Sequence, residues 1–131
     1  MFDTQDDDQS APIDRAALAV ISRGDGATER RLLGVFRKAT AADAAAFKVA
    51  LEQRDIRAVI GAAHRVLGAS RLAGATTLAL ICNTIAQSGR AGDWDAISAN
   101  RNEFYREFER VKAYLDSQLD REPGAQSDGR P

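Results

Sequence analysis

The chain has 131 residues, a length at which one hydrophobic core forms without disulfides or structural metals. Its 44% hydrophobic and 28% charged residues are typical of a globular protein, and a formal net charge of −1 argues against a basic nucleic-acid-binding surface. A single cysteine, Cys82, excludes an internal disulfide. The acidic start of the chain lacks the apolar stretch of a signal peptide, and no run reaches the ~18 apolar residues of a membrane span.

Composition divides the chain into three parts. Residues 1–12 are acidic and polar, and we expect them to be disordered. Residues 121–131 have the composition of a flexible tail, whereas residues 13–120 carry helical hydrophobic periodicity throughout. β-Branched runs separated by hairpin turns are absent, so the pattern predicts an all-α domain.

The first predicted helix begins after Asp14, a good N-cap residue, and ends near Arg23, before a glycine-rich turn. A longer helix, with an alanine-rich middle, is predicted over about residues 28–51. The next helix begins after Asp55, and Gly74 either ends it, bends it or lies at a close contact between helices.

A fourth helix is predicted over about residues 75–88, closed by Gly89 and Gly92. The last covers about residues 93–119, where Phe104, Phe108, Val111 and Leu115 recur at helical spacing. Short connections make consecutive helices antiparallel neighbours. We therefore expect an up-down antiparallel four-helix bundle with a short additional N-terminal helix.

His64 is the only histidine of the chain and lies inside the third predicted helix. At 100° per residue, Arg57, Gly61, Gly68 and Arg71 lie within about 60° of it and share one stripe of the helix surface. The arc about 80–160° away holds Ile56, Val59, Ala63, Val66 and Ser70 and is the predicted core face. We therefore expect His64 to be exposed to solvent.

Glycine inside a helix costs roughly 0.5–1 kcal/mol relative to alanine. Gly61 and Gly68 beside the histidine therefore need a reason. One reason is the close approach of another molecule to the imidazole; the alternative is the close approach of a neighbouring helix. The arginines have the alternative of forming an ordinary solvated face.

The residues after His64 continue this pattern. Gly68 is followed by the small pair Ala69-Ser70 and by Gly74-Ala75. The matching positions on the next helix and the turn after it are Leu78, Ile81, Cys82, Ile85 and Gly92-Asp93. The pattern resembles the signature of histidine phosphotransfer (HPt) domains, with His64 at the place of the phosphoacceptor and the likeness covering about residues 13–118.

The resemblance implies a helical bundle that takes a phosphoryl group from a receiver-domain aspartate and passes it to another receiver in two-component signalling. It implies no autonomous kinase activity and no cofactor in this chain, with Mg²⁺ supplied by the receiver. The expected partners are response-regulator receiver domains, and a histidine kinase core where the domain is a module of a larger protein. A cytoplasmic monomer is expected, free-standing or at the cytoplasmic end of a membrane-bound hybrid sensor kinase, with no nucleic-acid or direct membrane contact.

Two positions depart from the family pattern. Leu67 stands where the family usually has a lysine that holds the phosphoryl group, and Ala86 stands where it often has glutamate or glutamine. Arg71 and Arg65 are the predicted substitutes for the lysine charge. Gln87 is the predicted residue that orients the ring.

Docking of the receiver is predicted on Gly61, Leu67 and Leu72, with Arg57, Arg65 and Arg71 facing the acidic pocket of the receiver. Packing inside the bundle is the alternative for the two leucines. A second hypothesis is a helical adaptor that binds a partner without accepting phosphate. An autonomous enzyme is disfavoured, because the sequence has no phosphate-binding loop and Ser70 lies on a different side of the helix from His64.

Overall fold

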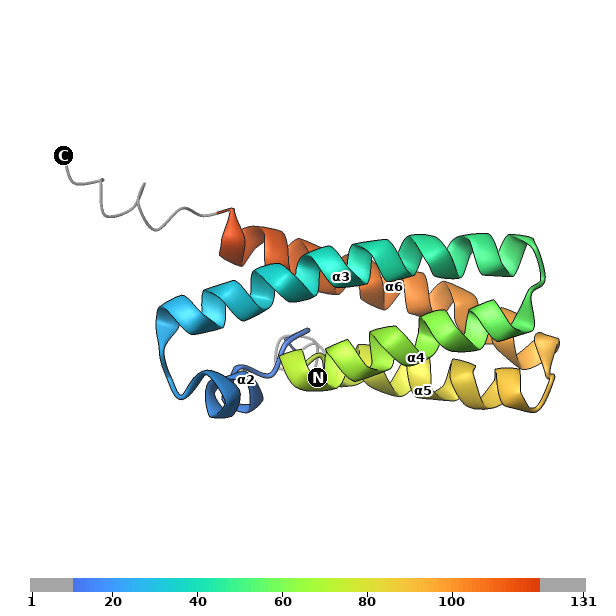
Figure 1. Cartoon of the computed structure of the whole chain (residues 1–131), viewed down its shortest axis with the longest axis horizontal. Helices are drawn as coiled ribbons and strands as arrows, with labels where there is room; N and C mark the ends of the chain where they lie inside the picture. Colours follow the sequence, from blue (N-terminus) through green and yellow to red (C-terminus); the bar gives the residue numbers. More distant parts are fainter. Residues whose placement is uncertain (1–10, 121–131) are drawn as a thin grey trace, which may run out of the picture.

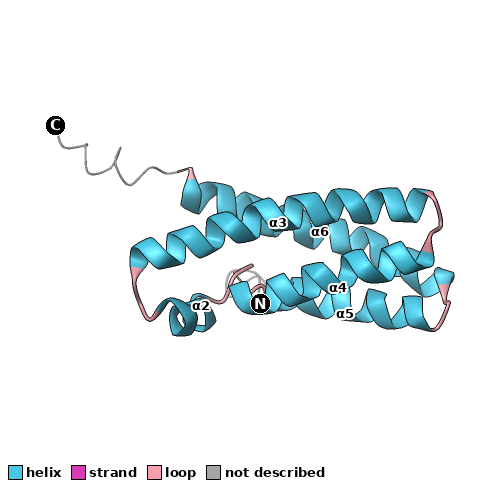
Figure 2. Cartoon of the chain, in the orientation of Figure 1, coloured by secondary structure: helices cyan, strands magenta, loops and turns pink. Residues whose placement is uncertain are grey.

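The structure, a computed structural model, describes residues 11–120. The predicted tail over residues 121–131, and all but the last two residues of the predicted disordered segment, lie outside the described residues. Residues 11–120 form five helices and no strand (Figure 2). Their bounds are α2 Arg15–Ser22, α3 Gly26–Glu52, α4 Ile56–Ala73, α5 Thr76–Arg90 and α6 Trp94–Leu119.

The four long helices, α3 to α6, lie side by side in an antiparallel up-down bundle (Figure 1). Helix α4 packs against α3 and α5, and α6 closes the ring by packing against α5 and α3. The short helix α2 lies at one end of the bundle and contacts α3 and α4. The all-α bundle with a short leading helix is therefore confirmed.

Aspartate caps set most of the helix starts. The side chains of Asp14, Asp25, Asp55 and Asp93 each accept a hydrogen bond from a backbone N–H in the first turn of the helix that follows. Helix α5 follows Ala75 and has no side-chain cap. Because such caps are local in sequence, the starts of α2 and α4 were predicted from Asp14 and Asp55, and the other starts were predicted to within about two residues.

Gly74 and Gly89 each lie at a close contact between segments of the bundle, unlike the glycines beside His64. Gly74 ends α4 in the left-handed conformation at φ 84°, and its carbonyl accepts a 2.7 Å hydrogen bond from the Asp14 backbone N–H. It therefore ends the helix at a close contact, made with the segment before α2. Gly89 was predicted to close the fourth helix; instead it lies buried inside α5, where an added Cβ would come within 2.6 Å of Ile60 Cγ1.

The core runs along the axis of the bundle. Within it, Phe47 of α3 and Phe104 of α6 are in contact, with their ring centroids 4.6 Å apart. Val66 of α4 and Ile85 of α5 are fully buried in the same core. No helix among residues 11–120 is both long and apolar enough to cross a membrane.

Candidate functional site

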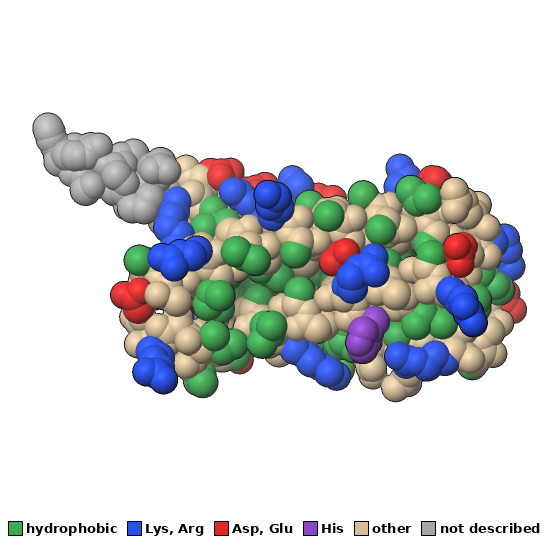
Figure 3. Space-filling model, in the orientation of Figure 1, with side chains coloured by type: hydrophobic (Ala, Val, Ile, Leu, Met, Phe, Trp, Pro, Cys, Tyr) green, Lys and Arg blue, Asp and Glu red, His purple; other side chains and the backbone are tan. Residues whose placement is uncertain are grey.

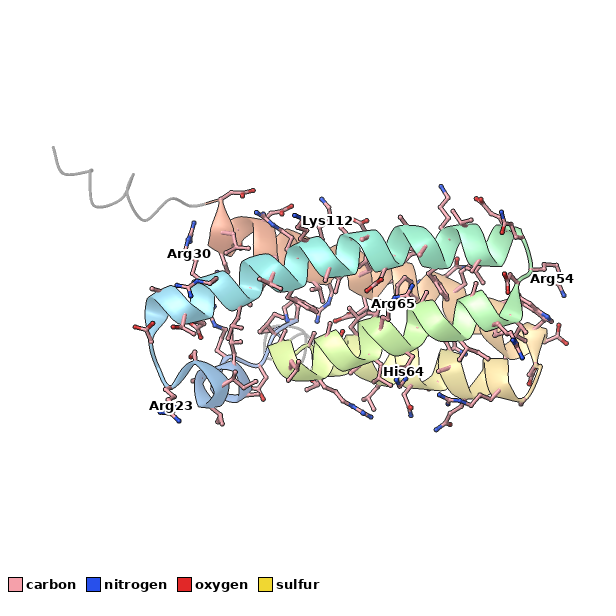
Figure 4. The ribbon with its side chains drawn as sticks, viewed as in Figure 1. Arg23, Arg30, Arg54, His64, Arg65 and Lys112 are labelled. Atoms are coloured by element: carbon pink, nitrogen blue, oxygen red, sulfur yellow. The ribbon has the colours of Figure 1, made fainter. Side chains whose placement is uncertain are left out.

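Helix α4 has one buried side and one open side. Val59, Ala63, Val66 and Ser70 are buried against the bundle, as the periodicity predicted, and Ala62 is buried with them. Ile56, the fifth residue of the predicted core face, is only partly buried. His64 is exposed on the opposite side and projects away from the bundle (Figure 4). The predicted exposure of His64 is therefore confirmed.

The glycines beside His64 leave the surface open. Among residues 11–120, a Cβ added at Gly68 would have no heavy atom outside its own helix backbone within 4 Å, and one added at Gly61 would meet only the Arg65 guanidinium, at 3.5 Å. No neighbouring helix therefore approaches through either glycine. The structure removes the packing explanation and leaves a bare turn beside the imidazole.

The three arginines of the predicted site differ in their contacts. Arg65 Nε donates a 2.8 Å hydrogen bond to Asp43 Oδ1 on α3, and Figure 4 shows Arg65 lying toward that helix. Arg57 and Arg71 are exposed and make no ion pair or hydrogen bond with any of the residues 11–120. The structure thus separates a cation already paired with a carboxylate from two that are available.

Leu67 is buried, with 5% of its surface exposed. Its predicted role in docking is therefore wrong, because a partner cannot contact a side chain that already packs in the core. The position also supplies no charge. At 100° per residue Leu67 lies about 60° from His64, between the stripe of His64 and the predicted core face. The helix packing buries it on the core side.

Leu72 lies on the open side of α4, with 66% of its surface exposed, and lines an apolar groove between α2, α3 and α4. The groove has a cavity volume of about 160 Å³. Its lining residues are Leu18, Ile21, Leu32, Val35, Phe36, Ala39, Ala69, Leu72 and Ala73. In Figure 3 hydrophobic side chains gather on this part of the surface, on the same face as His64.

This groove was not predicted from the sequence. One signal was present: Leu32, Leu33, Val35 and Phe36 form an apolar run wider than one face of a helix can bury. Leu33 and Phe36 are in the core, whereas Val35 is left 62% exposed.

Gln87 is exposed on α5 and makes no hydrogen bond with His64, and Ala86 beside it is fully buried. The ring of His64 has no hydrogen-bond partner among the described residues. The structure therefore does not bring Gln87 and His64 together as the ring-orienting role requires. That role stays a prediction.

Other chemistry-bearing groups are inside the bundle. Cys82 is buried, and burial raises the pKa of its thiol to about 12, so it remains a protonated, apolar core side chain. Ser70 is also fully buried. Within residues 11–120, no cluster of His, Cys, Asp and Glu side chains is arranged to hold a metal ion.

A comparison with protein families matches the Hpt domain over residues 31–121, about two thirds of the chain. The chain belongs to the Hpt domain family. Its structure is similar to the crystal structure of histidine-containing phosphotransfer protein B (HptB) from Pseudomonas aeruginosa PAO1, with a TM-score of 0.78 and 25% sequence identity. The match covers 86% of this chain and 98% of that one. A comparison with curated protein sequences gave no match.

Membership assigns the general role of this Hpt domain. Hpt domains are histidine phosphotransfer intermediates of two-component phosphorelays, where they interact with receiver domains, and they are not kinases. The matched region contains the whole of α4, α5 and α6 and therefore the open face around His64.

Proposed function

We propose that His64 is the phosphoacceptor of this Hpt domain. It takes the phosphoryl group of an aspartyl phosphate on one receiver domain and passes it to an aspartate on another. The observation that carries the assignment is the open surface at His64. The only imidazole of the chain is exposed on α4, beside a turn at Gly68 that has no side chain.

The chemistry requires a nucleophile that a partner can reach. In the neutral ring, the Nε2 lone pair attacks phosphorus while the proton stays on Nδ1. The N–P bond forms as the P–O bond to the aspartate breaks, and the carboxylate leaves. Transfer to the second receiver reverses these changes, with its aspartate as the nucleophile. Such a step depends on in-line positioning and charge neutralisation, and we propose that the receiver supplies the Mg²⁺.

Docking is proposed on the groove and the basic residues of the same face. The groove reaches Ala69 and Leu72 of α4, immediately after the bare turn at Gly68. An apolar helix of the receiver beside its aspartate pocket fits this lining, while Arg57 and Arg71 face the acidic pocket. Leu72 keeps its predicted docking role in this proposal, and the exposed residues of the groove take the place of Leu67.

The finer setting of the domain is also a proposal. The chain has no kinase activity of its own and acts in the cytoplasm as a monomer, either free-standing or as a module of a hybrid histidine kinase. Receivers of response regulators, and the kinase core in the second case, are its partners. The acidic pI of about 5.8 supports this proposal over nucleic-acid binding.

The test is phosphoryl transfer from labelled, phosphorylated receivers to the wild-type chain and to His64→Gln. We expect label on the wild type only, labile to acid and stable to base, as for a phosphorus–nitrogen bond. Circular dichroism of the variant checks that it is folded. Label that persists in His64→Gln would place the acceptor elsewhere.

The groove by itself supports a second candidate, an adaptor that binds a partner without phosphate. If the domain were an adaptor, the wild-type protein and His64→Gln would bind receivers with the same affinity, and neither would acquire label from any receiver. Binding and labelling measured on the same receivers therefore separate the two functions.

A further inference from the structure

Arg71 is a cation on the open face of α4 that has no partner among the described residues. It lies in the last turn of α4, it is exposed, and it makes no ion pair or hydrogen bond with residues 11–120. Arg65 is closer to His64 in sequence, but Asp43 already neutralises it at 2.8 Å. An anion formed at His64 therefore has Arg71 available without the loss of an existing ion pair.

Helix geometry directs Arg71 toward His64. Side chains on an α-helix lean toward its N-terminus. Arg71 follows His64 by two turns, about 10.5 Å along the axis, so its side chain leans toward the imidazole. Arg57 precedes His64 by the same distance, and its side chain leans away.

The surface between the two residues is clear. Gly68 lies between Arg71 and His64 on the same side of the helix, and a Cβ added there would meet no atom of the described neighbouring residues within 4 Å. A guanidinium group can therefore lie along the helix at this point. In Figure 3 basic side chains flank the single histidine on both sides.

Arg71 also lines a pocket between α4 and α5 that extends from Arg71 toward the level of His64. It has a cavity volume of about 300 Å³ and is also lined by Thr76, Ala79, Leu80 and Asn83 of α5. Gly89 lies against Ile60 where α4 and α5 pack, so in this antiparallel pair Asn83 lies opposite Val66. The pocket thus runs from Arg71 back almost to the level of His64.

We propose that the Arg71 guanidinium binds the phosphoryl group carried on Nε2 of His64. This inference rests on the proposed function of His64. The planar fork of arginine donates two parallel hydrogen bonds to phosphoryl oxygens, an arrangement stronger than a neutral contact. Arg71 therefore stabilises the loaded state of the domain and has no corresponding contact in the unloaded state.

The first experiment loads the domain without a receiver. Phosphoramidate, a small phosphoryl donor, reacts with an exposed imidazole, and the chain has only one. The Nε–H signals of the arginines are followed by NMR in ¹⁵N-labelled protein, with the Arg71 signal assigned from its absence in Arg71→Lys. We expect the Arg71 signal to shift on loading and the Arg106 signal to stay in place.

The second experiment measures the last pKa of the phosphoryl group by ³¹P NMR. Loss of a contacting cation in Arg71→Ala is expected to raise this pKa by about one unit, and Arg71→Lys to restore part of the difference. Arg106→Ala is the matched control, because it removes an equal charge from an exposed position on α6. Arg106 itself pairs only weakly with Glu103, at 4.0 Å.

An unmoved Arg71 signal in the loaded protein would overturn the proposal, as would an Arg57→Ala variant that raises the pKa as much as Arg71→Ala. The second result would assign the effect to the general field of the basic face. Because loading uses a chemical donor, a domain that shows the Arg71 contact but accepts nothing from any receiver would contradict the proposed function alone. Failure of His64 to load would contradict both.

Discussion

His64 lies on the open side of α4 because the opposite side of the helix is committed to the core. At most 1% of the surface of each of Val59, Ala63 and Val66 is exposed, and the spacing of these residues leaves His64 facing outward. Gly68 adds a cost to helix formation that packing does not recover, since none of the described residues would contact a Cβ at its position. A helix that keeps such a residue gives up stability for access to the imidazole.

Gly68 therefore gives a prediction at the scale of one residue. Gly68→Ala should raise the free energy of unfolding by about 0.5–1 kcal/mol, because alanine favours the helix and meets no neighbour. Gly68→Gln should also fold but should slow transfer from a phosphorylated receiver by about tenfold or more, because its side chain covers the turn beside the ring. Urea denaturation and the transfer assay measure the two effects.

Gly89→Ala is the matched control for stability. Its Cβ would come within 2.6 Å of Ile60 Cγ1, so this variant should unfold at a lower urea concentration than wild type. If Gly68→Ala were destabilised in the same way, the turn beside His64 would not be open in solution.

At the scale of elements, the site depends on how α2 lies across the end of the bundle. Arg15 of α2 pairs with Glu29 of α3 at 2.7 Å and donates a 2.7 Å hydrogen bond to Tyr114 Oη on α6. These contacts fix α2 beside the start of α3, where Leu18 and Ile21 form one wall of the apolar groove. A short helix that contributes little to the core thus completes the proposed docking surface.

The groove gives a prediction at this scale. Val35 lines it with 62% of its surface exposed, so Val35→Glu places a charge where we propose that an apolar helix docks. Receiver affinity should fall by about tenfold, as for a change at the centre of an interface, with the thermal stability of the free domain unchanged. Isothermal titration calorimetry with an unphosphorylated receiver measures the affinity.

Val49→Glu is the control for that substitution. It makes the same change on the same helix at a position 49% exposed and outside the groove. Equal losses of affinity in the two variants would show that added negative charge, and not the groove, weakens binding.

At the scale of the whole molecule, ion pairs join helices that are distant in sequence. Arg37 of α3 pairs with Asp116 and Asp120 near the end of α6, each at 3.0 Å. The hydrogen bond from Arg37 holds the pKa of the Asp116 carboxyl below its usual value. The closure of the bundle between α3 and α6 is therefore partly electrostatic at this end.

The pKa shift sets the sign of a pH dependence. A carboxyl whose pKa is lowered by folding stabilises the fold above its unfolded pKa, and the stabilisation is lost as the pH falls through the folded value. The melting temperature should therefore fall on acidification below about pH 4, and by less in Arg37→Ala. High salt should reduce the difference, because these groups are partly exposed. Arg106→Ala should show the same fall in melting temperature on acidification as wild type. If this fall were reduced in Arg106→Ala as much as in Arg37→Ala, a specific role for Arg37 would be excluded.

The sequence by itself determined the features that depend on neighbours along the chain. Asp14 and Asp55 cap helices through their own first turns, and the periodicity of α4 sets which of its sides is buried. The exposure of His64 follows from those two signals alone. Its relation to the Hpt family was also visible in the residues that follow it along α4.

Only the tertiary structure decided what depends on contacts between helices. It buried Leu67, paired Arg65 with Asp43 and joined α2, α3 and α4 into a groove around Leu72. A helical wheel fixes the direction of a side chain but not what it meets, and the partner of Arg65 is 22 residues away in the chain. The same limit explains Gly89, whose contact with Ile60 exists only because α4 and α5 pack in one particular register.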